Sequence, residues 1–129
     1  MKMYVDIFAL HNNLLNSARL AHWNVTGQEF YSQHLLFERI YKMLEPTLDT
    51  LAEQLRGMGI IIEANYLRQI DDLAAPFCDH LLQLATIYRN ALSDAITLAD
   101  NENRRGLSNV LQGVSSDIDT ITYLLQSQK

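Results

Sequence analysis

Two histidines and three carboxylates stand at spacings that suit metal binding. His22 comes before a short polar segment and His34 after it, and Glu38 follows His34 by one helical turn. Asp49 and Glu53 form a second pair at the same spacing. Side chains four residues apart share one face of a helix and can share an ion. Imidazole and carboxylate together suit Fe(II), Mn(II) or Zn(II) better than Ca(II) or Mg(II), and redox chemistry would select iron.

Both pairs belong to one polar stripe of a predicted helix. At 100° per residue, the stripe is about 100° wide. Its members are His34, Glu38, Glu45, Asp49 and Glu53. The apolar positions lie on the other side and are Leu36, Ile40, Met43, Leu44, Leu51, Leu55 and Met58. The stripe therefore points away from the core of its own bundle, and an ordinary solvated face is what spacing alone favours.

The separation of the two pairs determines how they could act together. His34 and Asp49 are ~15 residues apart, or about 22 Å along a helix, so one chain cannot bring both pairs to one ion. Two copies packed antiparallel about a two-fold axis near Met43 and Leu44 can do so. Each dimer would then hold two equivalent sites. His22, returned by the turn, would supply a second imidazole next to His34.

Four segments with apolar residues at three- and four-residue spacing predict the helices that position these side chains, and none alternates as a strand would. The predicted helices cover residues 3–23, 32–58, 76–99 and 104–126. The long connection between the second and third includes a short helix expected at 67–73. One long link between short ones predicts an all-α, ferritin-like four-helix bundle. Pro46 predicts a kink or bulge in the second helix.

Length, charge and cysteine content narrow the class of protein. The chain has 129 residues, a net charge of −5 and one cysteine, Cys78. Residues 1–129 fit a single domain. Basic residues do not cluster beyond a dipeptide, which disfavours binding to DNA. No apolar run approaches the roughly 18 residues of a membrane helix, and the N-terminus lacks a signal-peptide pattern. We expect a soluble cytoplasmic protein without membrane contact.

The stretch from residue 22 to residue 53 resembles the signature of the Dps mini-ferritins, the DNA-protection-during-starvation family. The matching pattern is His22-Trp23-Asn24-Val25-x-Gly27-x-x-Phe30-x-x-x-His34-x-x-x-Glu38, followed by Asp49-x-x-x-Glu53. Weaker similarity continues in His80-Leu81-x-x-Leu84-Ala85-x-x-Tyr88 and in Asp117-x-Asp119. The resemblance covers most of the chain.

This resemblance implies a ferritin-like bundle with a short extra helix between the second and third long helices, assembled as a hollow dodecamer. It implies a ferroxidase that oxidises Fe(II) with hydrogen peroxide, or with dioxygen, and stores ferric iron in the shell as protection against oxidative damage. The implied ligands are His22, His34 and Glu38 of one subunit and Asp49 and Glu53 of its two-fold partner. Trp23 would lie beside the iron and take up an oxidising equivalent. Zn or Mn could stand in place of iron.

Several features depart from the family pattern. Position 38 is usually Asp, so Glu38 could change which of two iron positions binds more tightly. Pro46 lies close to the predicted two-fold contact and could reshape it. The link between the second and third helices looks short, and the chain begins almost at its first helix, without the Lys-rich tail that many members use to hold DNA. A DNA-coating protein and a shell protein with a degenerate metal site are the alternatives.

The remaining polar candidates fall outside the 22-to-53 pattern. His11 and His80 have no carboxylates arranged around them and are interpreted as structural. Asp94, Asp100 and Glu102 are candidates for the acidic channels through which iron enters in the family. No glutamate is followed three residues later by histidine, so the intra-bundle di-iron motif is missing and an iron site is predicted between subunits.

Overall fold

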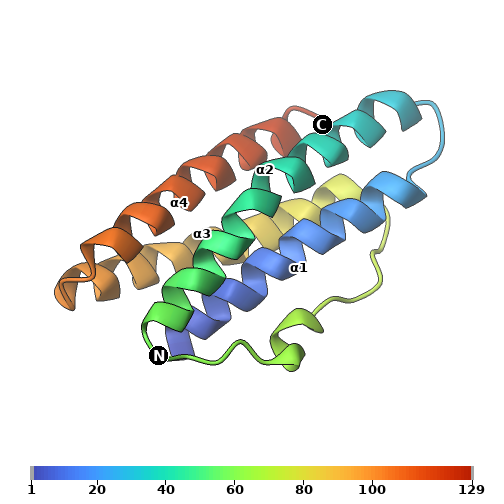
Figure 1. Ribbon diagram of the computed structural model, residues 1–129. Helices are drawn as coiled ribbons and strands as arrows, with labels where there is room; N and C mark the ends of the chain where they lie inside the picture. The colour runs from blue at the N-terminus through green and yellow to red at the C-terminus, as the bar shows by residue number, and fades with distance from the viewer. Residues whose placement is uncertain (1, 129) are drawn as a thin grey trace.

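The computed structural model describes residues 2–128, and all the regular secondary structure in that range is helical (Figure 1). The elements are α1 (Lys2–Asn24), α2 (Phe30–Gly57), the 3₁₀ helix η1 (Ala64–Leu67), α3 (Phe77–Asn101) and α4 (Arg105–Gln126). The four long helices are confirmed, with ends that differ from the predicted ones by at most two residues. None of the helices in residues 2–128 is long and apolar enough to cross a membrane.

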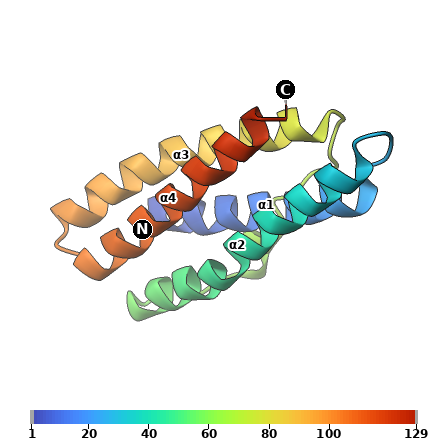
Figure 2. The same cartoon turned by 90° about the horizontal axis from the view of Figure 1, so that it is seen from above.

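The helices form a bundle in which α1 pairs with α2 and α3 pairs with α4. Contacts of α1 with α3 and of α2 with α4 close the bundle. The connection after α2 returns along the length of the bundle (Figure 1), so α2 and α3 run in the same direction (Figure 2). This crossover is the ferritin-like arrangement predicted from the loop lengths.

The short helix in the crossover exists, but its predicted position is wrong. It was expected at 67–73, whereas η1 ends at Leu67. The turn closes when the Tyr66 amide donates to the Glu63 carbonyl at 3.1 Å. The side-chain amide of Asn12 in α1 donates to the Leu67 carbonyl at 3.3 Å, which engages an acceptor that a longer helix would use. A tertiary contact thus gives the Leu67 carbonyl a partner at the end of η1, where local spacing predicted the start of the short helix.

The predicted division of α2 into two faces is confirmed. Its buried residues are Leu36, Phe37, Ile40, Leu44, Leu51 and Leu55, and Met43 and Met58 pack partly buried against the same core. The acidic side chains of the stripe are half-buried or exposed. The face that could bind ions is therefore left available on the outside of the bundle.

Pro46 lies inside α2, which is α-helical on both sides of it, from Phe30 to Gly57. Of the two alternatives predicted at Pro46, a kink or a bulge, the bulge is therefore absent from α2. The helix axis bends near its middle in both views (Figures 1 and 2). Proline cannot donate to the carbonyl four residues earlier and its ring crowds the preceding turn, which accounts for a bend without a bulge.

A compact turn at one end of the bundle joins α1 to α2. Gly27 has a φ of +99°. Residues with a Cβ atom rarely adopt this backbone conformation, whereas glycine adopts it readily. The Phe30 amide donates to the Gly27 carbonyl at 3.1 Å, and Val25, whose amide donates to Ala21, is buried beneath the turn. The last turn of α1 consequently faces the first turns of α2.

Candidate metal centre

His22 and His34 meet across this turn. Nδ1 of His22 donates to the backbone carbonyl of His34 at 2.8 Å, and Nδ1 of His34 donates to the carbonyl of His22 at 2.8 Å. The two rings stack with centroids 3.8 Å apart and planes 16° from parallel. His22 is buried and His34 is half-buried. The structure thus brings these two candidate ligands into direct contact.

The reciprocal hydrogen bonds define which ring atoms are left for an ion. A carbonyl oxygen only accepts, so each Nδ1 carries the proton. Each Nε2 of a neutral ring then keeps its lone pair, which is the form that binds a metal. Metal-binding histidines are usually oriented by such a bond from the other ring nitrogen. The pair therefore presents two nitrogen donors whose tautomers and ring orientations are already set.

Aromatic rings surround the histidine pair. Phe30 stacks on His34 with centroids 5.0 Å apart, and Tyr41 meets His22 edge-on at 5.3 Å. Trp23, the residue implied to lie beside the iron, is 67% exposed, and none of the ring contacts found in residues 2–128 involves it. Sequence reasoning missed Tyr41, although it falls two helical turns after His34 and therefore on the same face.

The carboxylates of the stripe differ in how they are engaged. Glu38 lies 3.5 Å from the Lys42 ammonium, one turn away. Glu45 accepts from Arg19 of α1 at 2.8 Å. Asp49 and Glu53 are exposed on the half of α2 beyond Pro46, and no ion pair found in residues 2–128 includes either of them. The carboxylates most open to an external cation are therefore the second pair.

Glu53 also lies beside positive charge. It lines a groove of about 560 Å³ that is also lined by Arg104 and Arg105 at the start of α4.

The structure brings only some of the predicted ligands together. His22 and His34 are in contact, and Glu38 lies on the same face of α2 as His34, but Asp49 and Glu53 stand on the other half of α2. Within residues 2–128, no three His, Cys, Asp or Glu side chains come close enough to hold one ion.

His11 occupies the centre of the bundle and has two hydrogen-bond partners. Its Nε2 donates to the Leu44 carbonyl at 2.7 Å, and its Nδ1 accepts from the Tyr88 hydroxyl at 2.7 Å. His11 is fully buried, and this burial lowers its pKa to about 4, which keeps the ring neutral. The interpretation of His11 as structural agrees with this burial, whereas its bond to α2 could not be read from the sequence.

One of the three candidates for an acidic channel is engaged within the chain. Glu102 accepts from the Tyr4 hydroxyl at 2.7 Å and from Arg104 at 3.1 Å. The hydrogen bond from Tyr4 lowers the pKa of Glu102, and burial together with Glu102 raises the pKa of Tyr4 to about 12. Asp94 and Asp100 are exposed. Glu102 therefore ties the start of α1 to the loop between α3 and α4.

Solved structures of Dps proteins share this architecture. The chain superposes on Dps from Staphylococcus aureus with a TM-score of 0.86 at 23% identity, covering 98% of this chain and 92% of that one. For the DPS protein of Vibrio cholerae O1, described as a ferritin-like diiron-carboxylate protein, the TM-score is 0.85 at 21% identity, covering 98% and 86%.

Sequence comparison agrees with the superpositions. The chain is 21% identical over 116 residues to the DNA protection during starvation protein of Brevibacillus brevis, covering 82% of this chain and 78% of that protein. No family model matches the chain. The fold of this chain is therefore the ferritin-like four-helix fold of the Dps proteins.

Proposed function

We propose that this chain is an iron-sequestering ferroxidase whose metal site forms between two copies. The observation that carries the proposal is the pair of reciprocal bonds between His22 and His34, at 2.8 Å each. These bonds leave two Nε2 donors oriented for an ion, and the remaining donors follow along the outer face of α2. Such pre-oriented imidazoles beside carboxylates suit a borderline transition metal.

An antiparallel partner would complete each site. His22, His34 and Glu38 of one copy would be joined by the partner's Asp49 and Glu53, because one helix cannot bend back to unite the two pairs. The surface around the histidine pair supports such a contact, since three large apolar side chains at this end of the bundle are exposed: Tyr31 at 72%, Trp23 at 67% and Leu35 at 43%. An exposed apolar patch of this kind is typical of a surface that another subunit covers.

The chemistry follows from the donor set. Ionised carboxylates bind Fe(II) and stabilise the more highly charged Fe(III). Two Fe(II) ions give one electron each to hydrogen peroxide, which takes up two protons and leaves as two water molecules. Because both electrons arrive together, no hydroxyl radical is released. The ferric product would be stored inside a closed shell. For this shell we propose the dodecamer that the resemblance implies, and for its location the cytoplasm.

An anaerobic Fe(II) titration followed by hydrogen peroxide tests this proposal. The wild-type protein should bind Fe(II) and form Fe(III) rapidly, and a His34→Ala/Asp49→Ala variant should lose both. A His80→Ala/Asp71→Ala variant, which removes the same residue types elsewhere, should behave as wild type. Absence of rapid Fe(III) formation, or unchanged kinetics in the first variant, would contradict a ferroxidase site.

A further inference from the structure

The joint in α2 at Pro46 separates the two candidate ligand pairs. His34 and Glu38 precede it, and Asp49 and Glu53 follow it. Pro46 has no N–H, so the carbonyl of Lys42 lacks its helical donor and the helix is least constrained there. A change of about 10° in the bend at Pro46 moves a residue one to two turns further on by roughly 1 to 2 Å, far more than the roughly 0.2 Å that metal–ligand distances tolerate.

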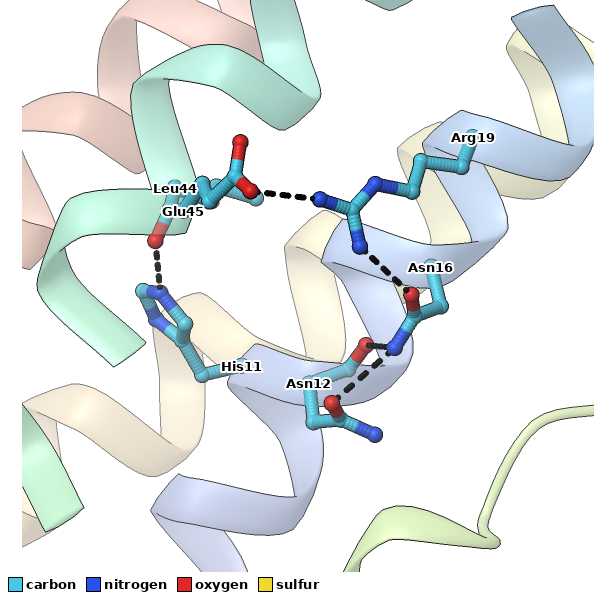
Figure 3. Close-up of polar contacts among 6 residues, drawn as sticks. All are labelled: His11, Asn12, Asn16, Arg19, Leu44 and Glu45. Atoms are coloured by element: carbon cyan, nitrogen blue, oxygen red, sulfur yellow. Dashed lines mark hydrogen bonds and ion pairs between the residues drawn. The ribbon is translucent and has the colours of Figure 1, made fainter. Parts of the chain in front are cut away.

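Helix α1 contacts α2 at the two residues directly before this joint (Figure 3). On the buried side, Nε2 of His11 donates to the Leu44 carbonyl at 2.7 Å. On the outer side, Nη2 of Arg19 donates to Oε1 of Glu45 at 2.8 Å. We call these two contacts the α1–α2 clamp. They attach α2 to α1 from inside and outside the bundle at consecutive residues.

The inner contact of the clamp is itself held in place. The Tyr88 hydroxyl of α3 donates to Nδ1 of His11 at 2.7 Å, and the two rings meet edge to face at 86°. Both side chains are fully buried. One chain of hydrogen bonds therefore runs from α3 through α1 to the backbone of α2. A buried chain of hydrogen bonds in which every polar group has a partner fixes one packing of the helices. Apolar residues of equal volume would give similar stability but would orient the helices less strictly.

The outer contact is also supported from within α1. Nη1 of Arg19 donates to Oδ1 of Asn16 at 3.2 Å, and the amide of Asn16 donates to Oδ1 of Asn12 at 2.9 Å (Figure 3). The Arg19 guanidinium also lies 5.3 Å from the centre of the Tyr41 ring. An exposed ion pair alone contributes little, but a guanidinium bound on several sides has one geometry.

We propose that His11 and Arg19 are positioning residues for the metal site. By fixing α2 before Pro46, they set where Asp49 and Glu53 stand relative to the histidine pair of the partner copy. The inference rests on the proposed function for its consequence in metal binding. The attachment of α2 to α1 can be measured without any metal.

Two measurements on two core variants test the inference. His11→Gln keeps a donor and an acceptor, while His11→Leu/Tyr88→Phe removes both polar groups without leaving one unpaired. Hydrogen exchange reports the α2 amides at 47–51, with amides near the middle of α4 as the reference. Anaerobic titration with Co(II), followed by its visible spectrum, reports affinity and ligand geometry.

For the double variant we expect α2 amides at 47–51 to exchange at least 10-fold faster than in wild type. Co(II) should bind roughly 10–100-fold more weakly and give an altered visible spectrum, because the loss of residues that orient metal ligands typically has an effect of this size. His11→Gln should restore both values to near wild type. Wild-type exchange and Co(II) affinity in a folded double variant would overturn the inference. If the double variant does not fold, Arg19→Met, which leaves the core intact, must show the same two changes at a smaller size.

The two proposals fail in different ways. If wild type binds no Co(II) and Fe(II) oxidation is absent, the proposed function fails, while faster exchange in the clamp variants would still support the attachment of α2. If wild type binds Co(II) normally and neither the clamp variants' exchange nor their affinity changes, the positioning role fails and the proposed function stands.

Discussion

Two imidazole rings at the end of the bundle hold each other through the backbone. Each ring donates to the carbonyl of the other residue, and the stacked arrangement leaves no freedom to choose a different tautomer. The ordering of these two side chains is thus completed during folding rather than during metal binding. At the residue scale, we therefore expect substitutions of the proposed ligands to change iron chemistry and to leave the fold almost unchanged.

Substitution of Glu38 tests this separation. Glu38→Ala removes a proposed ligand and only one weak ion pair with Lys42. We expect Fe(III) formation to slow at least 10-fold, whereas the free energy of unfolding should change by about 0.5 kcal/mol or less. Stopped-flow absorbance and urea unfolding give the two values. Glu29→Ala, an exposed carboxylate before α2, is the control, and equal kinetics in the two variants would remove Glu38 from the site.

The buried His11 predicts how stability depends on pH. Burial lowers its pKa to about 4, below the unfolded value near 6.5. The unfolded state therefore binds more protons between these values, so stability is full above about pH 6.5 and falls as the pH drops toward 4, by about 3 kcal/mol. Urea unfolding of wild type and His11→Gln between pH 7 and pH 4 should show the smaller fall in the variant. Parallel curves would contradict the assignment.

At the scale of elements, α2 carries both pairs of proposed ligands, and Pro46 lies between the two pairs. The half before the proline carries His34 and Glu38 and packs beside the turn that returns His22. The half after it carries Asp49 and Glu53 and ends at the C-cap beside Gly59, whose φ is +84°. Because the bend relates the two halves, a straighter helix should be more stable and less active.

Pro46→Ala tests the bend. Alanine restores the missing backbone donor, and a helix interior favours alanine over proline by about 3 kcal/mol. The net gain in stability should be smaller than this, because the surrounding core is packed against a bent helix. We expect a higher melting temperature together with slower Fe(III) formation and weaker Fe(II) binding. Calorimetry and an anaerobic Fe(II) titration measure the two changes. An increase in both stability and oxidation rate would show that the bend does not position the ligands.

Much of this element-scale picture could be predicted from the sequence because it is local. Apolar spacing located all four long helices, and Gly27 marked the turn that joins His22 to His34. Contacts between distant residues were not predictable in the same way. Asn12 bonds to the Leu67 carbonyl at the end of η1, His11 bonds to the Leu44 carbonyl and Arg19 to Glu45, and no local pattern encodes these contacts. The reciprocal bonds of the histidine pair likewise depend on how the turn packs.

At the scale of the whole molecule, an exposed apolar patch and the divided set of proposed ligands both support the proposed second copy. The patch consists of Trp23, Phe30, Tyr31 and Leu35 at the end where α1 meets α2. A charge introduced there would be buried without a partner on assembly, which costs several kcal/mol. Assembly and iron oxidation should therefore be lost together.

Tyr31→Glu tests this coupling. The side chain is 72% exposed, so the variant subunit should fold and keep its helical circular dichroism. Light scattering should show smaller particles than the wild-type assembly, and Fe(III) formation after peroxide should fall with them. A variant that assembles as wild type would exclude the patch from the contact, and a monomer that oxidises Fe(II) at the wild-type rate would exclude a shared site.

Mixed assemblies test the shared site most directly. His34→Ala and Asp49→Ala/Glu53→Ala subunits, each inactive alone, are co-expressed with different affinity tags and purified through both. In a mixed dimer, one site lacks His34 as well as Asp49 and Glu53. The other site has the intact histidines of one subunit and the intact carboxylates of its partner. With random pairing, about a quarter of the wild-type Fe(II) sites and of the wild-type oxidation rate should be recovered. No recovery in folded, mixed assemblies would contradict a site built from two subunits.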